Sequence, residues 1–128
     1  MKEIIEIKDI QLLVNSFYSK VRKDVLLKDI FNNAIGEKWD EHLEKLSRFW
    51  QTVLLGEHTY YGSPFVHHAN LPINKTHFDR WLKLFYETID EHFTGDKAAE
   101  AKTRAGNMAE MFQYKLEYYK TKARNPLV

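Results

Sequence analysis

The chain has 128 residues and a formal net charge of +1, with 44% hydrophobic and 29% charged residues. This balance is typical of one globular domain, so we expect a single domain over residues 1–128 with its core over about residues 9–119. The near-zero net charge disfavours a nucleic-acid partner. Because the chain has no cysteine, disulfides, thiolate metal sites and cysteine nucleophiles are excluded.

The N-terminal residues alternate charged and apolar side chains, so they cannot form the apolar stretch of a signal peptide. No window approaches the roughly 18 uncharged apolar residues that a membrane helix needs. The sequence therefore predicts a cytoplasmic protein with no membrane partner.

A first helix is predicted to begin at Asp9, a residue type that caps helices, and to reach Val21, because apolar residues recur there with helical spacing. Residues 26–36 contain two adjacent asparagines and end in glycine. They are predicted to be a tight connector that holds Phe31 inward.

A second helix is predicted over residues 39–54, ending at Gly56, followed by an aperiodic loop over residues 56–63. Ser63 and Pro64 are typical of a helix start, and Pro72 must end that helix. The sequence therefore predicts a helix of barely two turns between the two prolines.

Two further helices complete the predicted all-α fold. Thr76 and Asp79 have the spacing of a capping box, and a buried stripe follows from Phe78 as far as Gly95. Asp96 is expected to cap the last helix. The apolar stripe of this helix is Ala98, Ala101, Ala105, Met108, Phe112, Leu116 and Tyr119.

The sequence lacks the usual enzymatic motifs. None of the six histidines has a glutamate three positions before it, and zincin, P-loop, dinucleotide-binding and hydrolase-elbow patterns are all missing. The basic stretch over residues 115–124 is interpreted as a solvated helix end.

Two histidines lie at positions that suggest a role in binding. His42 lies on the apolar stripe of the second helix, where the simpler interpretation is a hydrogen-bonded core histidine. His68 lies on the short helix between the prolines, with an apolar residue three positions to either side. Two inward histidines in an aromatic-rich interior would suit a flat cofactor that needs one axial nitrogen ligand, a polar group opposite and an apolar sandwich. That cofactor is haem.

Several segments of the chain share a pattern with one known family. They are Phe17 to Asp24, Ile30 to Gly36, Trp39 to His42, Phe49-Trp50, Leu54 to Glu57, Pro64 with His68, Leu71-Pro72 and Phe78 to Phe85. In the order and spacing of these segments the chain resembles the truncated haemoglobin family, and its third group in particular, over residues from about 9 to 119. The glycines are all isolated in sequence, which departs from the paired glycines of the first two groups and agrees with the third.

The resemblance implies a globin-like fold, a shortened two-over-two helical sandwich, and a role for particular residues. His68 matches the proximal iron ligand, and Tyr18 and Trp81 match distal donors to the gas ligand. His42 matches a distal histidine that is either a donor or a gate of the pocket. Phe31 matches an aromatic wedge against the macrocycle; Leu46, Phe49 and Trp50 match the pocket wall; and Lys45, His67 and Arg80 are candidates for the haem propionates. Plain core packing remains the alternative for Tyr18, Trp81 and Phe31.

We therefore expect a protein that holds haem b without covalent bonds, since Cys-x-x-Cys-His attachment is impossible here, and that binds dioxygen, NO and CO. Three potential distal donors suit nitric oxide oxidation or peroxide chemistry more than storage. The chain has no room for a flavin domain, so catalysis would need a separate reductase; whether the protein is an enzyme stays open. The alternative is a haem-free helical interaction module, in which His68 and Tyr18 are core residues.

Overall fold

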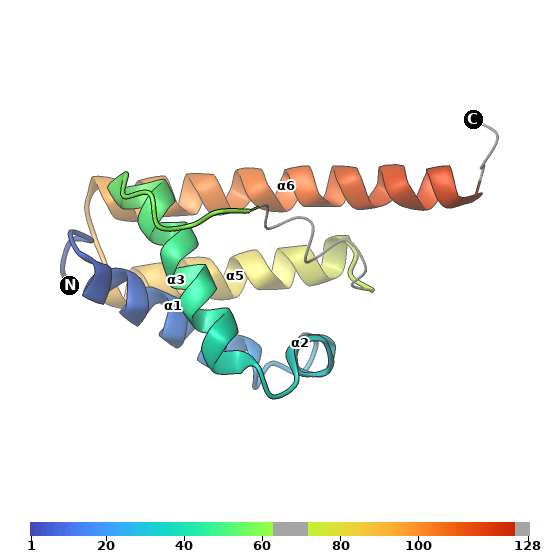
Figure 1. The fold of residues 1–128 in the computed structure, drawn as a ribbon, viewed down its shortest axis with the longest axis horizontal. Coiled ribbons are helices and arrows are strands. Elements are labelled where there is room, and N and C mark those ends of the chain that lie inside the picture. Colours follow the sequence, from blue (N-terminus) through green and yellow to red (C-terminus); the bar gives the residue numbers. More distant parts are fainter. Residues whose placement is uncertain (63–71, 125–128) are drawn as a thin grey trace.

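The structure, a computed structural model, describes residues 1–62 and 72–124, with the backbone alone for residues 119–124. These residues form helices and no strand, which confirms the predicted all-α class (Figure 1). The helices are α1 (Ile7–Val21), α2 (Lys28–Ile35), α3 (Trp39–Leu55), α5 (Lys75–His92) and α6 (Asp96–Arg124).

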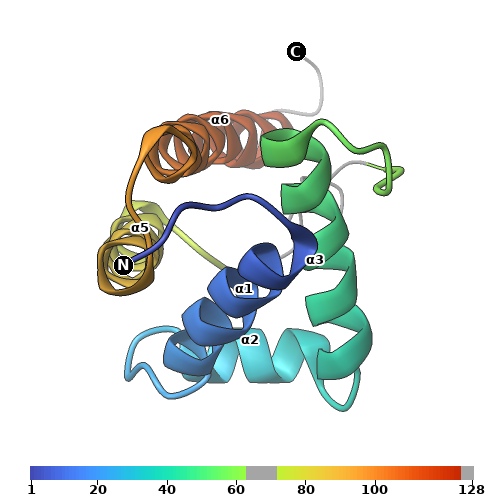
Figure 2. The ribbon, with the colours of Figure 1, turned by 90° about the vertical axis from the view of Figure 1, so that its left-hand side faces the viewer.

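The helices pack as two pairs. Helices α5 and α6 run alongside each other, and α1 packs against both α3 and α5 (Figures 1 and 2). The C-terminal end of α6 extends past the other helices (Figure 1). The largest buried side chains come mostly from α1 and α5, so the core lies where these two helices meet.

Helix α1 begins earlier than the sequence predicts. Its N-cap is Glu6, and Asp9, the expected cap, lies in the first turn. The Asp9 carboxylate reaches back to accept the backbone N–H groups of Ile5 and Glu6 at 3.0 and 3.1 Å, and it pairs with Lys2 at 2.8 Å. The prediction was wrong by one helical turn because a carboxylate three residues inside a helix can satisfy the same free N–H groups as a cap.

Helix α2 corrects the prediction of a connector over residues 26–36. The two asparagines have low helix propensity, but tertiary packing overrides it because Phe31 is 5% exposed and anchors the helix. Gly36 ends the helix with a φ of 61°, and its N–H donates to the Asn32 carbonyl at 2.8 Å. Phe31 points inward, as the sequence predicts.

Helix α3 confirms the prediction of a long second helix that ends at Gly56, whose φ is 70°. The loop after it is tied back to the helix, because the Thr52 hydroxyl accepts the backbone N–H groups of Thr59 and Tyr60 at 3.2 and 3.1 Å. The short helix predicted between the two prolines lies outside the described residues.

Helix α5 is capped by Asn74 and not at Thr76. The Asn74 backbone is extended, as a cap requires, and its side-chain oxygen accepts the Thr76 N–H at 3.0 Å, so Thr76 is already inside the first turn. In return His77 Nδ1 accepts the Asn74 N–H at 3.0 Å.

Within the described residues, no helix is long and apolar enough to cross a membrane.

Candidate functional site

A narrow cavity, here called the inner cavity, lies between α1, α3, α5 and α6. Its volume is about 40 Å³. The lining is mostly aliphatic and aromatic: Tyr18, Leu27, Phe31, Leu46, Phe49, Trp50, Ile73, His77, Phe78, Trp81, Met108, Ala109 and Phe112.

A second, wider cavity, here called the outer cavity, opens on the other side of α3. The volume open to the centre of a water molecule is about 460 Å³. The two cavities share Phe31, Leu46 and Phe49, so they are separated by no more than these side chains. The outer cavity is also lined by His42, Tyr60, Tyr61, three cations (Lys38, Lys45 and Arg48) and one acid (Glu41).

Tyr18 supplies a buried hydroxyl to the inner cavity. It lies on the buried face of α1 and is 3% exposed. Burial raises the pKa of the Tyr18 phenol to about 12, because the charged form would lose its hydration, and a hydrogen bond from Trp81 opposes this rise. The phenol is therefore protonated at neutral pH and remains a hydrogen-bond donor.

Trp81 brings a second donor from α5. Its indole can only donate, and it lines the inner cavity together with Tyr18. The ring stacks on Phe85, with centroids 5.6 Å apart, and meets Phe17 edge-on at 5.2 Å. The inner cavity therefore has two hydrogen-bond donors in its wall, the Tyr18 hydroxyl and the Trp81 indole.

His42 lies beside this pair without lining the inner cavity. Its ring meets the rings of Tyr18 and Trp39 edge-on, with both centroid distances 6.0 Å. It lines the outer cavity and is half-buried. The Trp39 indole N–H donates a hydrogen bond to Asn32 Oδ1 at 3.2 Å. His42 therefore separates the donor pair from the more open space outside α3.

The structure brings most of the remaining predicted site residues to one of the two cavities. Phe31, Leu46 and Phe49 line both, Trp50 lines the inner one, and Lys45 lines the outer one. Trp50 stacks on Phe85 at 5.2 Å, which joins the α3 wall to the α5 wall. His67 and His68 lie outside the described residues.

Arg80, predicted as a candidate for the propionates, lines neither cavity and pairs with Asp24. Its Nε donates to Asp24 Oδ1 at 2.7 Å, and its Nη2 lies 2.6 Å from the same oxygen. The other carboxylate oxygen accepts the backbone N–H groups of Leu26 and Leu27 at 3.1 and 3.2 Å. The side chain of Asp24 is only 3% exposed, so this is a buried carboxylate with three hydrogen bonds and an ion-pair contact.

Asp24→Asn is expected to lower the free energy of unfolding by about 1–3 kcal/mol at neutral pH, because a charge-assisted buried pair is lost. Burial alone would raise the pKa of Asp24, but the hydrogen bonds from Arg80, Leu26 and Leu27 hold it below its ordinary value of 3.8. The contribution is therefore present above that value and disappears as the pH falls through the lower pKa of the folded state. Urea unfolding of both proteins at pH 7 and near pH 3 measures this; a deficit of equal size at both pH values contradicts it.

Several residues of the inner cavity were not predicted as site residues. Phe78, Met108 and Phe112 belong to predicted helix stripes, and periodicity cannot separate a cavity wall from a filled core. His77 was not predicted as a site residue, because it lies outside the apolar stripe of its helix. In its neutral form Nε2 carries the proton, since Nδ1 accepts the Asn74 N–H. Within the described residues, no three His, Asp or Glu side chains gather as a metal site.

The comparisons with known proteins agree with this geometry. Residues 4–115 match the family model described as bacterial-like globin. A group 3 truncated haemoglobin of Campylobacter jejuni is 41% identical over 121 residues, which cover 91% of this chain and 95% of that protein. The crystal structure of a group III truncated haemoglobin from Campylobacter jejuni superposes with a TM-score of 0.83, over 91% of this chain and 95% of that one. The chain therefore belongs to the bacterial-like globin family, and the resemblance to group III truncated haemoglobins and their shortened helical sandwich is confirmed.

Proposed function

We propose that the protein holds haem b without covalent bonds in the inner cavity and binds dioxygen there, as well as NO and CO. The observation that carries this proposal is that two hydrogen-bond donors, Tyr18 and Trp81, lie in the wall of an otherwise largely apolar cavity. A storage pocket for an apolar molecule would need no such donors. A ligand that carries partial negative charge does need them.

The residues present fit this cofactor. The aromatic and aliphatic walls of the inner cavity suit a flat apolar macrocycle, and few polar groups in its lining compete for hydrogen bonds. The adjoining outer cavity offers Lys45, with Lys38 and Arg48, to the carboxylates of such a macrocycle. His68 is the proposed axial ligand, supported by the match of its segment to the family.

Bound haem supplies the iron that holds the gas ligand and exchanges single electrons. The chain supplies the surroundings. Tyr18 stays protonated because its pKa is about 12, and it donates its O–H to the gas. Trp81 supplies a second donor, its indole N–H, to the same cavity. The apolar walls exclude water, which keeps these bonds strong.

The absorption spectrum of the purified protein tests the proposal. We expect a Soret band that shifts when CO is added to the reduced protein. A folded, colourless protein that does not take up added haem would contradict the proposal and favour the alternative, a haem-free helical interaction module.

Oxidation of nitric oxide is the proposed further reaction, because the donors stabilise negative charge on dioxygen. Each turnover would consume an electron, which we propose a separate reductase supplies. The oxygenated protein is therefore expected to destroy about one equivalent of NO per haem, release nitrate and stop in the ferric state. An NO electrode and the visible spectrum record this. Continuous consumption of NO with NADH and no added reductase would contradict the proposal that a separate reductase supplies the electron.

A further inference from the structure

The inner cavity depends on an ion pair outside it. We propose that the Asp24–Arg80 pair is a positioning device that fixes the indole of Trp81 in the wall of the inner cavity that also holds Tyr18, and thereby sets how long dioxygen is retained. The inference rests on the proposed function, because it assigns a role to residues that would act on the bound gas through Trp81.

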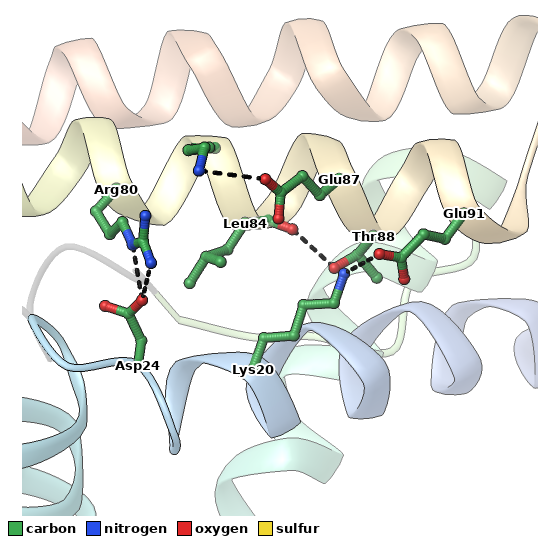
Figure 3. A network of polar contacts seen from close by, with 8 residues as sticks. Lys20, Asp24, Arg80, Leu84, Glu87, Thr88 and Glu91 are labelled. Carbon is green, nitrogen blue, oxygen red and sulfur yellow. Dashed lines mark hydrogen bonds and ion pairs between the residues drawn. The ribbon is translucent and has the colours of Figure 1, made fainter.

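The pair joins three segments that form the cavity. Arg80 belongs to α5, Asp24 follows α1, and the Asp24 carboxylate also holds the backbone at Leu27, the residue that precedes α2 (Figure 3). Leu27 and Phe31 both line the inner cavity. A single carboxylate therefore sets the distance between the donor wall on α5 and the aromatic wall on α2.

The pair also fixes the rotation of α5. Neighbouring residues of a helix point about 100° apart. Arg80 is therefore directed to the α1–α2 turn when Trp81 faces the cavity, and any rotation or slide of α5 moves both side chains together. The stacking of Trp81 on Phe85 is weakly directional, whereas two short bonds from a planar guanidinium to a carboxylate allow little displacement.

A second ion pair links α1 to α5, but it holds the two helices together less strongly. Lys20 pairs with Glu91 at 2.7 Å, but both side chains are partly exposed, 26% and 53% (Figure 3). Exposed pairs of this kind contribute little and are screened by salt. Within the described residues, Asp24–Arg80 is thus the buried polar link nearest to the donors.

The chain contains a matched control. Asp9 is also a buried carboxylate that accepts two backbone N–H groups and pairs with a more exposed cation, Lys2. Neither residue lines a cavity. Asp9→Asn and Lys2→Gln therefore remove the same chemistry from a place that does not carry Trp81. They separate a general loss of stability from a displaced donor.

The test compares Asp24→Asn and Arg80→Gln with those two controls, each as the haem-loaded protein. We expect the first two variants to release dioxygen about three- to tenfold faster, which corresponds to partial loss of one hydrogen bond. CO release should stay within about twofold, because bound CO is nearly apolar and gains little from donors. In the CO form, the NMR signal of the Trp81 indole N–H should move in these variants and stay in place in the controls.

The positioning role would be overturned if Asp24→Asn and Arg80→Gln gave the same gas release rates and the same indole N–H signal as Asp9→Asn and Lys2→Gln. Arg80→Gln keeps the test decisive if Asp24→Asn fails to fold, because the guanidinium side chain is 38% exposed and the Asp24 carboxylate keeps its two backbone N–H donors, Leu26 and Leu27. Arg80→Lys, which keeps the charge but loses the planar fork, should fall between wild type and Arg80→Gln. Absence of a Soret band in the wild type would instead refute the proposed function.

Discussion

His68→Ala is expected to lose most of its haem during purification, while His67→Ala retains most of it. If residues 64–71 are helical, as the sequence predicts, adjacent side chains point about 100° apart, so only one imidazole can face the iron. Removal of that ligand leaves apolar contacts alone to hold the cofactor. The ratio of Soret to protein absorbance after desalting measures retention.

His92→Ala is the control for this pair, because His92 is half-buried at the end of α5 and lines neither cavity. It should retain haem like the wild type. Equal retention by His67→Ala and His68→Ala would show that His68 is not the axial ligand, whether or not the protein binds haem.

Tyr18→Phe is expected to speed dioxygen release by roughly ten- to a hundredfold and to change CO release little. A charge-assisted hydrogen bond in a dry pocket contributes about 1.5–3 kcal/mol, and about 1.4 kcal/mol corresponds to a factor of ten. The phenylalanine keeps the ring and its contacts with Phe31 and His42, so the change is confined to the donor. Stopped-flow release of both gases measures the ratio.

Trp81→Phe should have a smaller effect in the same direction if its indole N–H shares the ligand oxygen with Tyr18, and a larger effect if Tyr18 points elsewhere. Trp50→Phe is the matched control. Trp50 lines the same cavity and also stacks on Phe85, but it is not a partner of Tyr18. Its loss should change the release of both gases together. Unchanged dioxygen release in Tyr18→Phe and Trp81→Phe would mean that these aromatic residues only pack.

Periodicity was enough to predict the long helices and their buried faces, because burial of an apolar stripe repeats every turn. It failed at α2, where the stabilising contact of Phe31 comes from distant residues and the local sequence favours a turn. Helix starts were misplaced at Asp9 and Thr76 for a related reason. A polar residue inside the first turn and a true cap have similar sequence signatures.

The roles of the candidate site residues stay predictions, but the structure shows which of these residues lie together. Tyr18 and Trp81 both line the inner cavity, which depends on the packing of α1 against α5, and no local pattern encodes that packing. Arg80 illustrates the same limit. Its partner Asp24 is 56 residues away along the chain, so no local pattern indicates this ion pair.

The most direct test of the account is the resonance Raman spectrum of bound dioxygen in H₂O and in D₂O. If the Tyr18 proton is donated to the gas, the oxygen stretching band shifts when exchangeable protons are replaced by deuterons, and Tyr18→Phe abolishes most of that shift. A band that is insensitive to D₂O in the wild type, or a shift that persists unchanged in Tyr18→Phe, would contradict the central claim that this phenol faces the ligand.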